Sequence, residues 1–170
     1  MRLRTALTIG VVAALGGAAV ASAHIRIDPA RPGAGSDTRL TLAVPSELRT
    51  SPTTKVSVQL PASIVSASFR AIPGWKRTVV IQKLVKPTTL DGETITQRIA
   101  SVTWTATGGG IAPGDVENFE ILVALPNRPG AKLAFPTVQT YANGKVMRWI
   151  GAADADEPAP IVALGPTVGA

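Results

Sequence analysis

Residues 79–105 read VVIQKLVKPTTLDGETITQRIASVTWT, and this stretch decides the fold class. Apolar and polar residues alternate with a period of two in 79–85 and again in 95–105, and both runs are rich in Val, Ile and Thr. Such alternation is typical of strands that bury one face. Asp91-Gly92 stands between the two runs and favours a tight hairpin turn. The stretch therefore predicts a pair of antiparallel strands.

The second of these strands contains an irregularity. Ile95 and Ile99 fall on one face of it, whereas Val102 and Trp104 fall on the other. One extra residue in a strand moves the following side chains to the opposite face, so this change of phase predicts a β-bulge.

The same period-two pattern continues outward from this hairpin. Turn signals such as Pro73-Gly74, Pro113-Gly114 and Asn143-Gly144 separate the patterned segments, and none of those segments shows a helical repeat. Strands separated by turns at intervals of roughly ten residues predict an all-β fold, an antiparallel sandwich or barrel, and we expect an antiparallel β-sandwich, cupredoxin-like or immunoglobulin-like. The further strands are expected at 38–44, 55–60, 119–125 and 133–141.

The first 23 residues have the features of a secretory signal peptide. Arg2 and Arg4 precede an apolar run, and Ala21 and Ala23 provide the small-x-small pattern after which signal peptidase cleaves. The run is shorter than the ~20 residues that cross a bilayer. We therefore expect 1–23 to be removed, the chain to be exported to the periplasm or the extracellular space, and no membrane anchor to remain.

Cleavage after Ala23 would leave 147 of the 170 residues, a length that suits one domain. We assign that domain to 24–164 and expect 165–170 to form a flexible C-terminal tail. The 147 residues carry 15 basic and 11 acidic side chains, and the basic ones are scattered along the sequence. Nucleic-acid binding requires a concentrated basic patch, so we expect no nucleic-acid partner, and we expect a monomer.

The chain has no cysteine and a single histidine, His24. Nucleophilic triads need a histidine inside the fold, a blue-copper centre needs two histidines and a cysteine, and the usual zinc sites need three or four such ligands. These sites are excluded, and we expect that the chain is not an enzyme. The acidic runs at 115–120 and 154–157 stand beside turns and are interpreted as solvated loops.

His24 becomes the first residue if the signal peptide is removed as predicted. Its α-amino nitrogen and its imidazole Nδ1 would then chelate one metal ion in a six-membered ring. Two nitrogen donors in a tetragonal plane favour Cu(II), which also stands at the top of the divalent affinity order. The alternative is that cleavage merely falls before a histidine without a role, and one residue leaves that alternative open.

Six ordered motifs follow His24 along the chain. They are VPSELRTSPTTKVSVQLP (44–61), PGWK (73–76), VTW (102–104), GIAPG (110–114), FPTVQTYANGKVMRWIG (135–151) and PAPIVAL (158–164). With His24, these motifs resemble those of the YcnI-like family of bacterial copper-binding proteins. The resemblance implies a cupredoxin-like β-sandwich that binds one Cu(II) per chain through a single-histidine brace.

The resemblance also implies that the metal is held by His24 and by the carboxylate of Glu47, beside Trp149. Glu47 follows the predicted strand 38–44, at a sheet end where loops gather. Trp149 alternates with Val146, Arg148 and Ile150. It and Met147 are therefore expected to face away from the side of Val146 and Ile150, which also fits an ordinary core tryptophan. Ser46 stands where the family commonly has asparagine, which changes the group expected to orient the Glu47 carboxylate.

We therefore expect an extracytoplasmic Cu(II)-binding protein that acts in copper acquisition, delivery or homeostasis. Its expected partners are a membrane copper transporter or another copper chaperone. Two alternatives stay open: a metal-independent adhesion or partner-binding module, and an oxidative copper enzyme, which would need the second histidine that this chain lacks.

Overall fold

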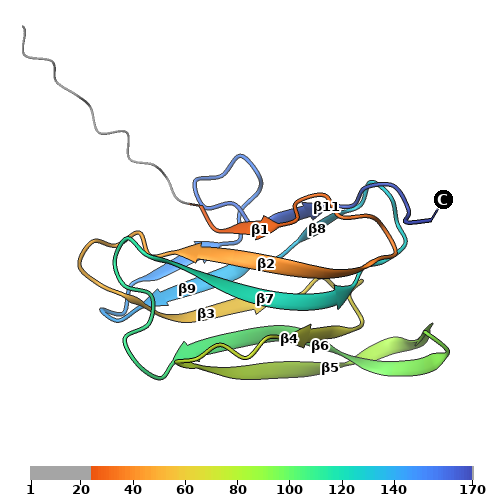
Figure 1. The fold of residues 1–170 in the computed structure, drawn as a ribbon, viewed down its shortest axis with the longest axis horizontal. Coiled ribbons are helices and arrows are strands. Elements are labelled where there is room, and N and C mark those ends of the chain that lie inside the picture. Colours follow the sequence, from red (N-terminus) through yellow and green to blue (C-terminus); the bar gives the residue numbers. More distant parts are fainter. Residues whose placement is uncertain (1–23, 170) are drawn as a thin grey trace, which may run out of the picture.

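The computed structural model describes residues 24–169, so the predicted signal peptide lies outside the described residues. All regular elements of this part of the chain are β-strands, and they form two packed layers (Figure 1). Residues 24–169 contain no helix long and apolar enough to cross a membrane. The predicted all-β antiparallel sandwich is confirmed.

The first layer is a four-stranded antiparallel sheet in the order β1-β2-β7-β4. Along its second strand Leu40, Leu42 and Val44 are fully buried and the residues between them are not, because successive side chains point to opposite faces. The strands are β1 (Arg26–Asp28), β2 (Asp37–Pro45), β7 (Val116–Ala124) and β4 (Ala67–Phe69).

The second layer is a five-stranded antiparallel sheet in the order β10-β9-β3-β6-β5. A small two-stranded sheet, β11-β8, lies beside β1 (Figure 1). The strands of the second layer and of the small sheet are β3 (Thr53–Gln59), β5 (Trp75–Leu90), β6 (Glu93–Ala106), β9 (Thr137–Tyr141), β10 (Val146–Trp149), β8 (Lys132–Ala134) and β11 (Ile161–Ala163).

The strands β5 and β6 form the hairpin that 79–105 predicted. They turn at Asp91-Gly92, and both of these residues have positive φ angles, which is the conformation of a two-residue hairpin turn. Val80 pairs with Ser101, but the next residue of β5 pairs with Ile99. Ala100 is therefore the extra residue of a bulge, and the predicted irregularity is confirmed.

The predicted strand at 133–141 is wrong as a single strand, because the chain changes sheet within it. β8 ends at Ala134 and β9 begins at Thr137. Pro136, between them, has no amide hydrogen with which to continue a ladder. β8 pairs with β11, whereas β9 pairs with β3 and β10.

Residues 165–168 follow the last strand and are hydrogen bonded to the body of the domain. The amides of Gly165 and Val168 donate to the carbonyl oxygens of Pro32 and Ala34, at 2.8 and 3.2 Å respectively. We expected this end of the chain to be a flexible tail. That flexibility stays a prediction, although the loop before β2 offers hydrogen-bond partners for the backbone groups of these residues.

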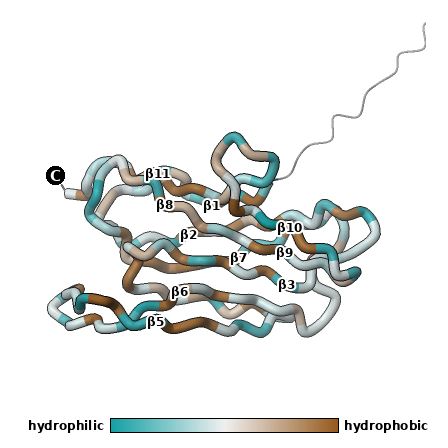
Figure 2. Tube along the Cα trace, turned by 180° about the vertical axis from the view of Figure 1, so that it is seen from behind, coloured by the Kyte–Doolittle hydropathy of each residue, from teal (hydrophilic) through white to brown (hydrophobic). Residues whose placement is uncertain are grey.

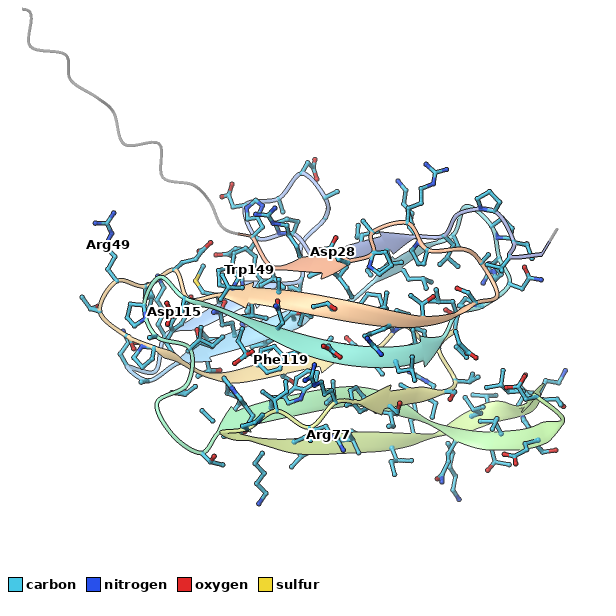
Figure 3. All side chains as sticks on the ribbon, viewed as in Figure 1. Asp28, Arg49, Arg77, Asp115, Phe119 and Trp149 are labelled. Carbon is cyan, nitrogen blue, oxygen red and sulfur yellow. The ribbon has the colours of Figure 1, made fainter. Side chains whose placement is uncertain are left out.

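An aromatic cluster fills the space between the two sheets at the β5 side. The ring of Phe119 lies 5.1 Å from that of Trp75 and 4.8 Å from that of Trp104. Figure 3 shows Phe119 between the layers, and Figure 2 shows how hydrophobic residues follow the strands. Trp75 and Trp104 therefore serve packing, which leaves Trp149 as the tryptophan of the candidate site.

Candidate metal centre at the N-terminal edge

His24 lies two residues before the start of β1, at one side of the sandwich. β1 pairs with β2 so that Arg26 lies opposite Ala43, and continuing this register places His24 opposite Pro45. The side chain of Ile25 is buried in the core, whereas His24 is half-buried. The β1 register and the burial of Ile25 thus place His24 beside the end of β2.

The structure brings His24 and Trp149 together. Their ring centroids lie 5.6 Å apart at an interplanar angle of 68°, an edge-on contact. Trp149 is 1% exposed, Met147 on the same face is half-buried, and Val146 and Ile150 point to solvent, as the alternation predicted. Figure 3 shows Trp149 beside the start of β1.

A buried glutamine, Gln139, holds the Trp149 indole in place. The Gln139 side chain is 0% exposed, and its Oε1 accepts a hydrogen bond of 3.1 Å from Trp149 Nε1. Its Nε2 donates to the carbonyl oxygen of Pro45 at 2.8 Å and to Thr53 Oγ1 at 2.7 Å. A fully satisfied buried network fixes the side chains that it joins. Gln139 therefore ties Trp149 to the end of β2, the segment opposite His24.

Sequence reasoning did not find Gln139, although a signal was present. Gln139 lies in phase with Phe135 and Tyr141 along the chain, and both of these aromatic residues are buried. A polar residue between two inward-facing aromatic residues of the same phase is a candidate for a buried hydrogen-bond network.

Ser46 forms its hydrogen bonds with other segments of the chain and not with the Glu47 carboxylate. It is buried, and its Oγ accepts a hydrogen bond of 3.3 Å from Thr53 Oγ1. Its amide donates to the carbonyl oxygen of Asp115 at 2.9 Å, and its own carbonyl accepts from Gly114 N at 3.0 Å. The Ser46 hydroxyl is thus directed inward, and two hydrogen bonds fix the backbone just before Glu47.

Glu47 lies exposed on the loop after β2. Its carboxylate forms no hydrogen bond or ion pair within 24–169, including with His24. Burial raises the pKa of the Tyr141 hydroxyl above its usual value, and the negative charge of nearby Glu47 raises it further. The structure therefore places Glu47 near the end of β9, with its carboxylate free of protein partners.

A shallow pocket of about 210 Å³ opens beside His24. Within the described range, no group of three or more His, Cys, Asp or Glu side chains converges closely enough to hold a metal ion. A metal site at this edge must use another kind of donor, and cleavage before His24 would create one in its α-amino nitrogen. The residues that line the pocket are His24, Arg26, Asp28, Ala43, Pro45 and Val116.

A family model described as a domain of unknown function, DUF1775, matches residues 24–164. The chain belongs to this family. This DUF1775 chain is 37% identical over 140 residues to the copper-binding protein CutI of Bacillus subtilis (strain 168), an alignment that covers 82% of this chain and 61% of CutI. The chain thus spans less than two thirds of the length of that relative. The predicted membership of the YcnI-like family is confirmed.

A solved relative shows the same fold as the DUF1775 chain. The crystal structure of an uncharacterized protein from Nocardia farcinica, described as an immunoglobulin-like fold, superimposes with a TM-score of 0.64 and 29% sequence identity. The match covers 84% of this chain and 98% of the Nocardia chain. The sandwich is therefore immunoglobulin-like. Neither CutI nor the Nocardia protein is described by an enzymatic activity.

Proposed function

We propose that the chain, once cleaved before His24, binds one Cu(II) ion and acts outside the cytoplasm in copper acquisition, delivery or homeostasis. The observation that carries the proposal is the contact between His24 and the buried Trp149 at a strand edge. The name of the relative CutI supports copper as the metal.

In this proposal each of three residues has its own task. His24 supplies its α-amino nitrogen and its imidazole, and such nitrogen donors suit Cu(II). Glu47 supplies a carboxylate, which can turn toward the ion without breaking a hydrogen bond or an ion pair to the described residues. Trp149 shields one side of the site, and because its N–H is already used by Gln139 it acts through its ring.

The proposal includes export and processing. The α-amino nitrogen of His24 is part of an amide until Ala23 is removed, so the site requires cleavage after the predicted signal peptide at 1–23. The proposed exchange partner is a membrane copper transporter or another copper chaperone, and the proposed unit is a monomer.

The test compares the chain that begins at His24 with the same chain carrying one methionine before His24. A Cu(II) titration followed by electron paramagnetic resonance should give one equivalent bound with nitrogen coupling for the first protein. The extended protein should bind about 100-fold or more weakly, because one chelating nitrogen is lost. Equal affinities of the two proteins would contradict the proposal.

Trp149→Phe separates shielding from coordination in the same experiment. The variant keeps an aromatic ring and both His24 donors, so it should still bind one Cu(II) with a similar nitrogen coupling. Loss of all Cu(II) binding in this variant would show that the proposed division of tasks is wrong.

A further inference from the structure

The longest strand, β5, forms one edge of the five-stranded sheet, on the side of the molecule opposite β1 (Figure 1). Among the described strands, only β6 is hydrogen bonded to it. The N–H and C=O groups on the other side of an edge strand are free to pair with another chain, and proteins usually keep such edges short or covered. β5 is 16 residues long and almost entirely exposed.

The same strand exposes large apolar side chains. Val80 and Ile81 are each 59% exposed, and Val85 is 107% exposed. Together with Val79 they make four of the nine exposed large hydrophobic residues of the described chain. Single exposed hydrophobic residues are ordinary, but a group on one free edge indicates an interaction site. Figure 2 shows the hydrophobic stretches along β5.

The charge of β5 is positive throughout. It carries Lys76, Arg77, Lys83 and Lys86 and no acidic residue. Arg77 is occupied, because its Nη1 donates to the carbonyl oxygen of Phe69 at 2.8 Å and its guanidinium lies 5.3 Å from the Phe69 ring centroid. The three lysines are exposed and form no ion pair with another described residue. Their charge is available to a partner of opposite sign.

We propose that β5 is a docking edge for an extended acidic segment of a partner protein, which pairs with β5 as an additional strand. The backbone of the segment would bond to the free N–H and C=O groups of β5. Its acidic side chains would face the three lysines, and its apolar side chains would contact Val80 or Val85. The proposal does not depend on copper, and the docking edge lies away from His24.

A second copy of this chain does not fit the edge. Antiparallel pairing of two β5 strands centred on Ile81 would place Lys76 of one copy opposite Lys86 of the other. Like charges directly opposite destabilise a strand pair, and lysines on an edge oppose self-association. An anionic membrane matches the charge but gives no strand ladder to the free backbone groups. An acidic extended peptide satisfies both.

The test is isothermal titration calorimetry with the chain that begins at His24 and a synthetic peptide of about 12 alternating glutamate and valine residues, which spans most of β5. The peptide should bind, and the double variant Lys83→Glu/Lys86→Glu should bind it about tenfold more weakly, because two attractive pairs become repulsive. Lys132→Glu/Lys145→Glu makes the same charge change at exposed positions outside β5 and should bind as the unchanged protein does.

A second peptide, N-methylated at alternate amides, cannot complete a strand ladder and should not bind. Equal binding of the methylated peptide, no binding of the unmodified one, or equal weakening by both double variants would each overturn the proposal. Binding to phosphatidylglycerol vesicles without binding to the peptide would assign the edge to a membrane and would also overturn it.

Discussion

The two outer edges of the sandwich differ in length and exposure. At one edge, the three-residue strand β1 (Arg26–Asp28) follows His24, whose ring contacts the buried Trp149. At the other edge, the 16-residue strand β5 (Trp75–Leu90) is mostly exposed to solvent. Gln139 connects the first edge to the core through hydrogen bonds to two strands and a strand end. The second edge is paired with β6 and contacts the aromatic cluster of the core through Trp75. A short, hydrogen-bonded edge fixes individual side chains, and a long, exposed edge offers backbone and charge.

The substitution Gln139→Leu should destabilise the β1 edge and have the largest effect of the changes considered. Leucine fits the site without hydrogen bonding, so Trp149 Nε1 and the Pro45 carbonyl oxygen would lose their Gln139 partner, at about 1–3 kcal/mol for each buried group. We expect the free energy of unfolding to fall by about 2–4 kcal/mol in urea unfolding followed by circular dichroism. Gln97→Leu, at an exposed position of β6, is the matched control and should change it by less than about 0.5 kcal/mol. Similar losses of unfolding free energy in both variants would show that the Gln139 hydrogen bonds do not stabilise the β1 edge.

Glu47→Gln should affect metal binding and leave stability unchanged. The variant keeps the size of the side chain and removes the charge that the proposed copper site uses, so the Cu(II) affinity should fall about tenfold in a chelator competition titration. The free energy of unfolding should stay the same, since the carboxylate has no partner in the described chain. Glu93→Gln, exposed in the β5–β6 hairpin, should change neither quantity; a comparable affinity loss there would indicate nonspecific electrostatics.

Tyr141→Phe should change how stability depends on alkaline pH. Burial raises the pKa of Tyr141 in the folded state, so the unfolded chain releases this proton first as pH rises through about 10. The free energy of unfolding of the unchanged protein should therefore fall relative to that of the variant as the pH rises above about 10, and the difference should be constant at lower pH. Parallel curves over the whole range would show that Tyr141 is not perturbed.

The smallest effect is expected for Val85→Thr on the β5 edge. Val85 is fully exposed, so the added hydroxyl is solvated and the free energy of unfolding should change by less than about 0.5 kcal/mol. Val58→Thr, at a fully buried position of β3, should lower the free energy of unfolding by about 1–3 kcal/mol, because the added hydroxyl is buried without a hydrogen-bond partner. Equal losses at both positions would mean that β5 is covered.

The strands β2, β3, β6, β7 and β9 could be predicted because each of them buries side chains. The strand β5 is almost entirely exposed and was predicted from its Val, Ile and Thr residues. The strands β1, β4 and β11 could not be predicted, since three residues are too few to show a period of two. The basic residues appear scattered when counted over the whole chain, and only the strand order shows that three free lysines share one sheet edge.

The candidate site was predictable in part. The family resemblance implied that His24 and Trp149 lie together, and their rings are in contact. Gln139 escaped prediction because glutamine in a strand usually faces solvent, and its inward position follows from hydrogen bonds to residues distant in sequence. The orientation of the Glu47 side chain could not be predicted, because Glu47 lies on a loop, where side chains do not alternate between two faces as they do in a strand.

The contact between His24 and Trp149 also gives the chain a built-in optical sensor. A paramagnetic ion quenches indole emission at short range, and Trp149 lies within 5.6 Å of the His24 ring, whereas Trp75 and Trp104 pack around Phe119. With Cu(II) bound as proposed, the fluorescence of Trp149 would be quenched, whereas Trp75 and Trp104 would continue to emit. The filling and emptying of the site would then be visible in the ultraviolet emission of the unlabelled protein.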